Sequence, residues 1–204
     1  GYWLCDNAYP QIKTITIGGV SPFIKGLTMR EETFKVYEFH ELSPEAQAKA
    51  LENNRYAFTD YDWWHNVYDS YLNDKKELSN NVIEINNITG FDICAGTVSL
   101  IYGVNMQLIR ERFGEKHPCI AGIKSYSHLF NCDTEAEEQA VDEIEAYVDE
   151  QVAEMKEMIL KSLREEYDHL TSDEAIIEMI EGNGYEFLSN GETFNIGFWQ
   201  WQVD

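Results

Sequence analysis

The sequence predicts an α+β fold in which an antiparallel sheet is packed by several helices, including one long acidic amphipathic helix. Apolar residues of segment 134–168 recur at steps of three and four, the period of a helix with one buried face. Residues 83–104 alternate instead between apolar and polar side chains, as half-buried strands do. Hydrophobic residues make up 44% of the chain, enough to build a core and more than acidic disordered segments contain.

The first 28 residues differ in composition from the rest, because they hold few charged residues and several turn-forming glycines. Within them, residues 13–17 alternate like a short strand. Met29 then precedes a segment that resembles an ordinary protein start. We therefore expect residues 1–28 to form an N-terminal extension or arm, and residues 29–204 to form a single α+β domain.

Residues 34–39 are mostly aromatic or β-branched and predict a strand. A helix is predicted to follow over residues 44–53. Ser43 can cap it by accepting a free backbone N–H, and Pro44 at the first helical position gives up no needed donor. Glu45 then faces the positive end of the helix dipole.

A second helix is predicted to begin near Thr59 or Asp60. It carries a mostly aromatic stripe at helical spacing, formed by Tyr61, Trp64, Tyr68, Tyr71 and Leu72. The following strands are expected to pair antiparallel around turns at Asn86–Asn87 and Ala95–Gly96. A short helix over residues 106–113 should then end at Gly114.

The long helix is expected over residues 134–168, about nine turns. Thr134, with Glu137 three residues on, forms a capping box at its start. A second capping box, at Thr171 and Glu174, predicts a helix over residues 173–180 that Gly182 closes in a left-handed conformation.

The chain is expected to end in a hairpin with arms at 185–188 and 194–201 around a turn at 189–191. Trp199 and Trp201 share one face of the second arm, and the other face is also apolar. That arm is therefore either central in a sheet or exposes one face to a partner. Both tryptophans are candidate aromatic interface residues.

The charge balance excludes several classes of function. The chain contains 37 acidic and 15 basic residues, so its formal net charge is −22. Direct binding to nucleic acid or to an anionic membrane surface is disfavoured, because both need a basic face. No apolar run reaches the ~20 residues of a membrane span, and the chain start lacks the features of a signal peptide. The four cysteines form no CxxC pair, so we expect a protein of the reducing bacterial cytoplasm without a zinc or disulfide framework.

Acidic residues are concentrated in the predicted long helix. Between Glu135 and Glu154 there are nine, with no Lys or Arg. Like charges at spacings of three and four destabilise a helix slightly, so stability alone does not explain the pattern. Two interpretations remain, a solvated face and a partner-binding surface. The candidate partner-binding residues are Glu137, Glu138, Asp142, Glu145, Asp149 and Glu150.

No catalytic motif of the hydrolase, metalloprotease or nucleotide-binding type occurs. Asp60, Asp62 and His65 could hold the metal ion of a metal-dependent hydrolase, but aspartates at these positions also serve as helix caps. Cys132 and His128 stand four residues apart without a third orienting group. We therefore expect no enzyme activity, no catalytic residues, no bound metal and no cofactor.

Four segments resemble a known group of proteins. They read Val-Tyr-Glu-Phe-His-Glu-Leu-Ser-Pro-Glu-Ala at 36–46 with Lys49–Ala50, Asp-Trp-Trp at 62–64 with Tyr68, Phe91–Asp92, and Tyr-Glu-Phe-Leu-Ser-Asn-Gly at 185–191. In this pattern residues 29–204 resemble small acidic proteins encoded by bacteriophages and prophages. Members usually carry a Gly-rich aromatic segment after the two strands, which residues 103–106 replace here. The resemblance implies no catalytic residue, but it implies an accessory factor that blocks a host defence.

The leading hypothesis is a phage-encoded inhibitor of a host nucleic-acid-targeting defence complex, of the anti-CRISPR or anti-restriction type. Its partner would be a host protein or ribonucleoprotein whose basic groove the acidic helix occludes by mimicking nucleic acid. An alternative is a module that sequesters a small nucleotide signal in an aromatic pocket. The basic residues available for that role are Arg110, Arg112 and Lys124.

Overall fold

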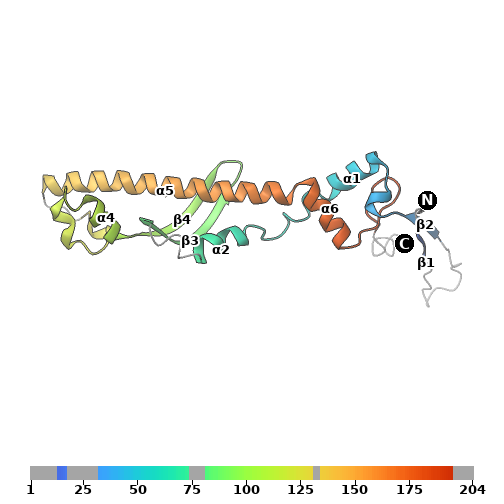
Figure 1. Ribbon diagram of the computed structural model, residues 1–204, viewed down its shortest axis with the longest axis horizontal. Helices are drawn as coiled ribbons and strands as arrows, with labels where there is room; N and C mark the ends of the chain where they lie inside the picture. Colours follow the sequence, from blue (N-terminus) through green and yellow to red (C-terminus); the bar gives the residue numbers. More distant parts are fainter. Residues whose placement is uncertain (1–12, 18–31, 74–80, 131–133, 195–204) are drawn as a thin grey trace, which may run out of the picture. The chain divides into compact units, whose positions relative to one another are not determined.

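The computed structural model describes residues 13–17, 32–73, 81–130 and 134–194, which divide between two units (Figure 1). Unit 1 comprises Gly1–Asp60 and His169–Asp204, and unit 2 comprises Tyr61–Asp168. Both combine helices with antiparallel strands, so the predicted α+β class is confirmed. The expected domain boundary at residue 28 stays a prediction.

Among its described residues, unit 1 contains two paired strands, two helices and a small apolar core. Its elements are β1 (Lys13–Ile17), β2 (Glu32–Val36), the 3₁₀ turn η1 (Phe39–Glu41), α1 (Pro44–Asn54) and α6 (Asp173–Gly182). β1 pairs antiparallel with β2, Ile15 lying opposite Phe34. The core consists of Phe39, Leu42, Ala46, Ala50, Ile176, Met179, Ile180 and Phe187.

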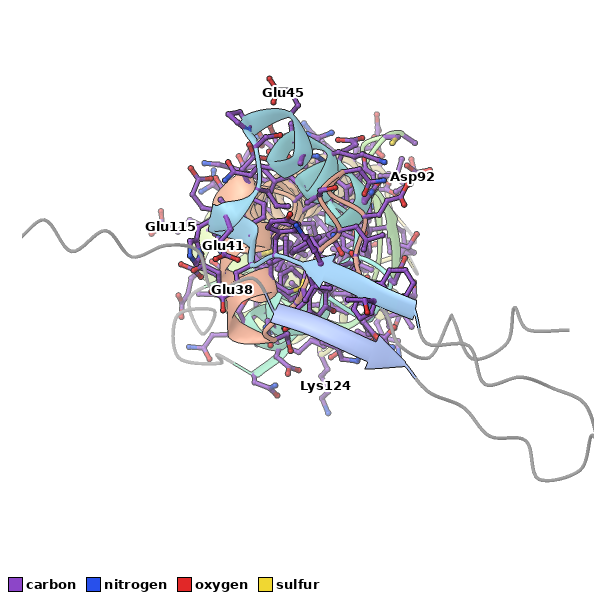
Figure 2. All side chains as sticks on the ribbon, turned by 90° about the vertical axis from the view of Figure 1, so that its right-hand side faces the viewer. Glu38, Glu41, Glu45, Asp92, Glu115 and Lys124 are labelled. Carbon is purple, nitrogen blue, oxygen red and sulfur yellow. The ribbon has the colours of Figure 1, made fainter. Side chains whose placement is uncertain are left out.

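The predicted strand at 34–39 ends earlier than expected, because η1 begins at Phe39. Glu38 and Glu41 stabilise this turn, since the Glu41 carboxylate accepts the Glu38 backbone N–H at 2.9 Å (Figure 2). The turn buries Phe39 in the core of unit 1. α1 then begins as predicted, with Ser43 Oγ accepting the Ala46 N–H at 3.3 Å.

Two predicted details of α6 are wrong. Ser172, not Thr171, is the N-cap, and its Oγ accepts the Ala175 N–H at 3.2 Å. The carbonyl of Thr171 instead accepts Nη1 of Arg55 at 2.8 Å. Gly182 remains helical, and the left-handed residue is Gly184, with φ +62°. Asn183 makes this later end possible, because its backbone N–H and its side-chain amide both donate to the Met179 carbonyl.

The predicted turn at 189–191 is confirmed, with Gly191 at φ +80° and its N–H donating to Leu188 O. Phe187 bridges to Thr193 on one side and to Tyr37 on the other. The turn lies so close to α1 that a side chain at 191 would collide with the carbonyl of Ala46. The rest of the predicted second arm, including Trp199 and Trp201, lies outside the described residues.

Unit 2 is organised along one long helix, beside which α4 and the β3–β4 hairpin lie (Figure 1). Its elements are α2 (His65–Asn73), β3 (Ile83–Asp92), β4 (Thr97–Val104), α4 (Met106–Phe113), η2 (Pro118–Gly122), η3 (Tyr126–His128) and α5 (Glu135–Leu170). β3 and β4 form an antiparallel hairpin in which Ile88 lies opposite Leu100. No helix of the described residues is long and apolar enough to cross a membrane.

α5 confirms the predicted long helix and runs for 36 residues. Thr134 Oγ1 accepts the Glu137 N–H, and the Glu137 carboxylate accepts the Thr134 N–H, which completes the predicted capping box. The apolar stripe is buried as expected, from Ala140 to Leu163. Its first half packs against α4, η2 and Leu129, and its second half packs against α2 and the hairpin.

Two predicted boundaries in unit 2 are wrong. α2 begins at His65, so Tyr61 precedes the helix and is 77% exposed. Instead of lining a helical stripe with Tyr61, Trp63 and Trp64 pack edge-on against Phe91. The expected turn at Asn86–Asn87 is absent, because β3 continues through it with a register shift. The second turn is confirmed, with Gly96 at φ +68°.

Candidate functional site: the acidic face of α5

The candidate site is a row of four carboxylates on α5, which we name the acidic face: Glu138, Asp142, Glu145 and Asp149. All four side chains are exposed. Steps of four, three and four residues place them on one side of the helix, about 6, 4.5 and 6 Å apart along its axis. The acidic face therefore presents a regular line of negative charge from a rigid element.

None of these four carboxylates forms an ion pair within the part of the chain that the structure describes. Neighbouring members repel one another, because like charges three or four residues apart on a helix are unfavourable. The apolar packing beneath α5 offsets this repulsion, since another side of the helix is buried from Ala140 to Val152. The repulsion would fall if a basic surface covered the row.

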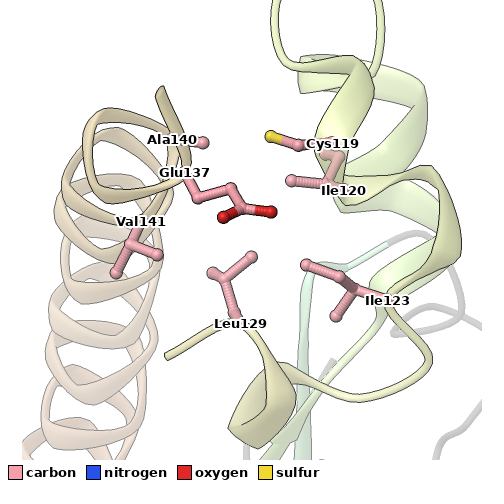
Figure 3. A pocket seen from close by; sticks show the side chains of 7 residues that line it. All are labelled: Cys119, Ile120, Ile123, Leu129, Glu137, Ala140 and Val141. Atoms are coloured by element: carbon pink, nitrogen blue, oxygen red, sulfur yellow. The ribbon is translucent and has the colours of Figure 1, made fainter. Parts of the chain in front are cut away.

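Glu150 and Glu137 were expected in the same surface, but the structure separates them from the row. Glu150 is exposed and lies one residue, about 100°, around the helix from Asp149. Glu137 is half-buried, and its carboxylate points into a small pocket between α5 and η2 (Figure 3). That pocket of about 20 Å³ is lined otherwise by apolar side chains and Cys119. With its role in the capping box, Glu137 is placed to hold the helix start.

Glu143 shows how a carboxylate of the same helix is used for stability. Lys116 Nζ lies 2.6 Å and His117 Nε2 lies 3.0 Å from Glu143 Oε2. Hydrogen bonds from His117 and then from Lys116 lower the pKa of Glu143 below its ordinary value. His117 is buried, at 7% exposure, so this cluster fastens the loop before η2 to α5. Sequence reasoning missed it, because the partners lie far from Glu143 in sequence.

The charges of the acidic face affect the pKa of Tyr126 in η3. Burial, followed by the charges of Glu145 and Asp149, raises the pKa of Tyr126 to about 12. The row therefore passes close to η3, and its negative potential extends to that part of the surface.

Acidic side chains also lie on other elements, among them Glu45 on α1, Asp92 at the end of β3 and Glu115 after α4 (Figure 2). These side chains are exposed but belong to separate elements. The acidic face differs from them because one rigid helix holds its carboxylates in a line.

The residues considered for metal binding are not gathered into a site. Within the described residues, no group of three or more His, Cys, Asp or Glu side chains is placed to hold a metal ion. His65 Nδ1 lies 3.1 Å from the backbone carbonyl of Asp62, which is a local contact at the start of α2. His128 is exposed, and Cys132 lies outside the described residues.

The basic residues considered for a nucleotide pocket have structural partners. Arg110 Nη1 donates to the Ile123 carbonyl at 2.7 Å, and the Arg112 guanidinium stacks 4.3 Å from the Tyr147 ring centre. Lys124 is exposed (Figure 2). A second, open depression of about 330 Å³ lies between α2 and α5. Neither this depression nor the pocket at Glu137 has an aromatic side chain among its lining residues.

We compared the chain with protein-family models, with curated proteins and with solved structures, and none of the three comparisons found a match.

Proposed function

We propose that the protein is a phage-encoded inhibitor that places the acidic face of α5 in the basic nucleic-acid groove of a host defence complex. The partner would be a CRISPR effector complex or a restriction enzyme. The observation that carries the proposal is the row of four exposed carboxylates, which has no ion pair among the described residues and stands on one long helix.

The spacing of the row supports nucleic-acid mimicry. Successive carboxylates stand about 4.5 to 6 Å apart along the helix axis. Phosphates along one nucleic-acid strand are separated by about 6 to 7 Å, so Lys and Arg side chains arranged for phosphates can meet carboxylates at this spacing. The net charge of −22 adds long-range attraction, which speeds association with a basic partner.

The resemblance to phage and prophage proteins supports the biological context. An acidic accessory protein of a phage gains from blocking host enzymes that attack its genome, and such enzymes hold nucleic acid in basic channels. A protein with this role needs a rigid charged surface but no catalytic group.

The proposal is tested by measuring DNA cleavage by a panel of purified bacterial CRISPR effector complexes and restriction enzymes with increasing amounts of the protein. Inhibition of at least one member is expected, relieved by excess DNA because both compete for one groove. If no member is inhibited, or if excess DNA has no effect, groove occlusion is wrong.

Two triple variants separate the acidic face from net charge. The face variant carries Asp142→Lys, Glu145→Lys and Asp149→Lys, and the control variant carries Glu157→Lys, Glu178→Lys and Glu181→Lys. All six side chains are exposed, and each variant changes the net charge from −22 to −16. We expect the face variant to inhibit at least tenfold less than the control variant, because only the face variant places like charges against the groove.

A further inference from the structure

The β3–β4 hairpin has two edges that differ in how well they are protected. β3 carries two register shifts, between Ile85 and Asn87 and between Ile88 and Gly90, each with the extra residue on β3. Such bulges disturb an edge and hinder further strand pairing, and the exposed charges of Glu84 and Asp92 do the same. β3 is therefore a blocked edge.

β4 has neither the bulges nor the charged side chains that protect β3. Its eight residues, Thr97–Val104, read Thr-Val-Ser-Leu-Ile-Tyr-Gly-Val, without a charged residue or proline and without a bulge. On one edge β4 pairs with β3, and no described residue pairs with its other edge. A regular edge strand of this length leaves a row of backbone donors and acceptors ready to pair with another strand.

The side chains of β4 also favour contact with another chain. Ile101 is 53% exposed and Tyr102 is 36% exposed, although both are large and apolar in character. They lie in the longest uncharged stretch of the sequence, from Ile93 to Ile109, although a quarter of all residues are charged. Two copies of a chain of charge −22 can approach here without placing carboxylates directly opposite each other.

We propose that β4 pairs antiparallel with β4 of a second copy of this chain, so that two hairpins join into one four-stranded sheet. Antiparallel pairing of identical strands has two-fold symmetry and is self-complementary. With the axis at Ile101, Ile101 meets Ile101 of the second copy, and Leu100 meets Tyr102. The pairing places apolar cross-strand pairs at the centre and no like charges opposite each other on β4.

Charge outside the strand sets how this dimer responds to salt. The Glu84 carboxylate lies beside Gly103 at one end of β4. In addition to burial, the charges of Glu145 and Asp149 raise the pKa of Tyr126, and Tyr102 of β4 contributes to the same rise, so the negative potential of the acidic face reaches β4 as well. Two copies therefore repel each other around the paired strands. Salt screens this repulsion, because the Debye length falls from about 10 Å at 0.1 M to about 3 Å at 1 M.

Sedimentation of the full chain over a range of protein concentrations, at low and at high NaCl, tests the proposal. We expect a monomer–dimer equilibrium whose dimer fraction rises with concentration and with salt. Binding of the acidic face to a basic partner weakens with salt, so the two associations have opposite salt dependence. A chain that stays monomeric at every concentration and salt, or a dimer that salt weakens, overturns the proposal.

Variants locate the contact. Ile101→Lys, at an exposed position of β4, should weaken the dimer at least tenfold, because it places two lysines opposite each other at the centre of the paired strands, and Ile101→Glu should do the same with two carboxylates. Met158→Lys on α5 is the matched control, because Met158 is also 53% exposed and the substitution adds the same charge. Circular dichroism confirms that each variant is folded. The proposal is overturned if Met158→Lys weakens the dimer as much as the folded β4 variants do.

Hydrogen exchange tests the backbone contact independently of side chains. Amides of Thr97–Val104 should exchange more slowly as the dimer fraction rises, and amides of Ile83–Asp92 should not change with protein concentration. Concentration-dependent protection that omits β4 overturns strand pairing even if a dimer forms.

Discussion

Single residues on α5 show that the same side-chain type serves two purposes. Glu143 accepts hydrogen bonds from Lys116 and His117, whereas Glu138, five residues earlier on the same helix, is exposed and has no ion pair among the described residues. Nothing local in the sequence separates these two glutamates. The difference arises because the loop before η2 packs against α5 and brings Lys116 and His117 to Glu143.

The first prediction concerns the pH dependence of this cluster. The pKa of Glu143 is lowered in the folded state, so its contribution to stability is present above the ordinary glutamate pKa and is lost as the pH falls through the lowered value. Glu143→Gln should therefore lower the melting temperature near neutral pH, and its difference from the wild type should shrink as the pH falls below the ordinary glutamate pKa. Glu138→Gln is the control. Equal effects of both substitutions would contradict the structural role of Glu143.

Gly191 gives a second prediction at this scale. It has φ +80°, and a Cβ there would collide with the Ala46 carbonyl, whereas Gly184 has φ +62° and open space around it. Gly184→Ala should cost about 1 kcal/mol through backbone strain alone. Gly191→Ala should cost clearly more, about 3 kcal/mol, because α1 must also move. Urea unfolding of both variants measures the difference, and equal losses would show that the turn does not press on α1.

Among the helices and strands, those with a long periodic pattern of apolar residues could be predicted more completely than the short ones. In α5 the helical spacing of apolar residues continues over about ten turns. The existence of this helix, its start and its buried face therefore follow from the sequence. The start of α2 does not, because aromatic residues at helical spacing also occur in the turns before it. The Asn86–Asn87 pair looks like a turn, but a bulge absorbs the irregular residue and β3 continues.

The N-cap of α6 provides an element-scale prediction. Thr171 and Ser172 are adjacent capping residues, and the structure uses Ser172. Ser172→Ala should destabilise the protein by about 1 kcal/mol, because the Ala175 N–H loses its acceptor. Ser172→Asp keeps an acceptor at the helix start and should restore most of the stability. If Ser172→Asp is as unstable as Ser172→Ala in chemical denaturation, the cap is not what holds this end of α6.

For the whole molecule, the acidic composition was evident from the sequence, but its distribution over functional and structural sites was not. The nine acids between Glu135 and Glu154 predicted a charged surface on the long helix. Helical spacing alone groups Glu138, Asp142, Glu145 and Asp149, so this row could be derived from the sequence. The positions of Glu137 in a pocket and of Glu143 in an ion pair depend on contacts with η2 and the loop before it.

The two proposed associations also belong to the whole molecule, and they differ in the sign of their salt dependence. Engagement of a basic groove by the acidic face weakens as salt rises, because attraction between opposite charges is screened. Pairing of β4 between two copies strengthens with salt, because repulsion between two chains of charge −22 is screened. Salt titration therefore separates the two associations without mutation.

The most direct test of the central claim is calorimetric titration of a CRISPR or restriction complex that the protein inhibits, with the wild type, the face variant and the control variant at two salt concentrations. The account predicts wild-type binding that weakens with salt, near-equal binding of the control variant, and at least tenfold weaker binding of the face variant. Equal binding of the face and control variants would contradict the claim that the acidic face of α5 engages the partner.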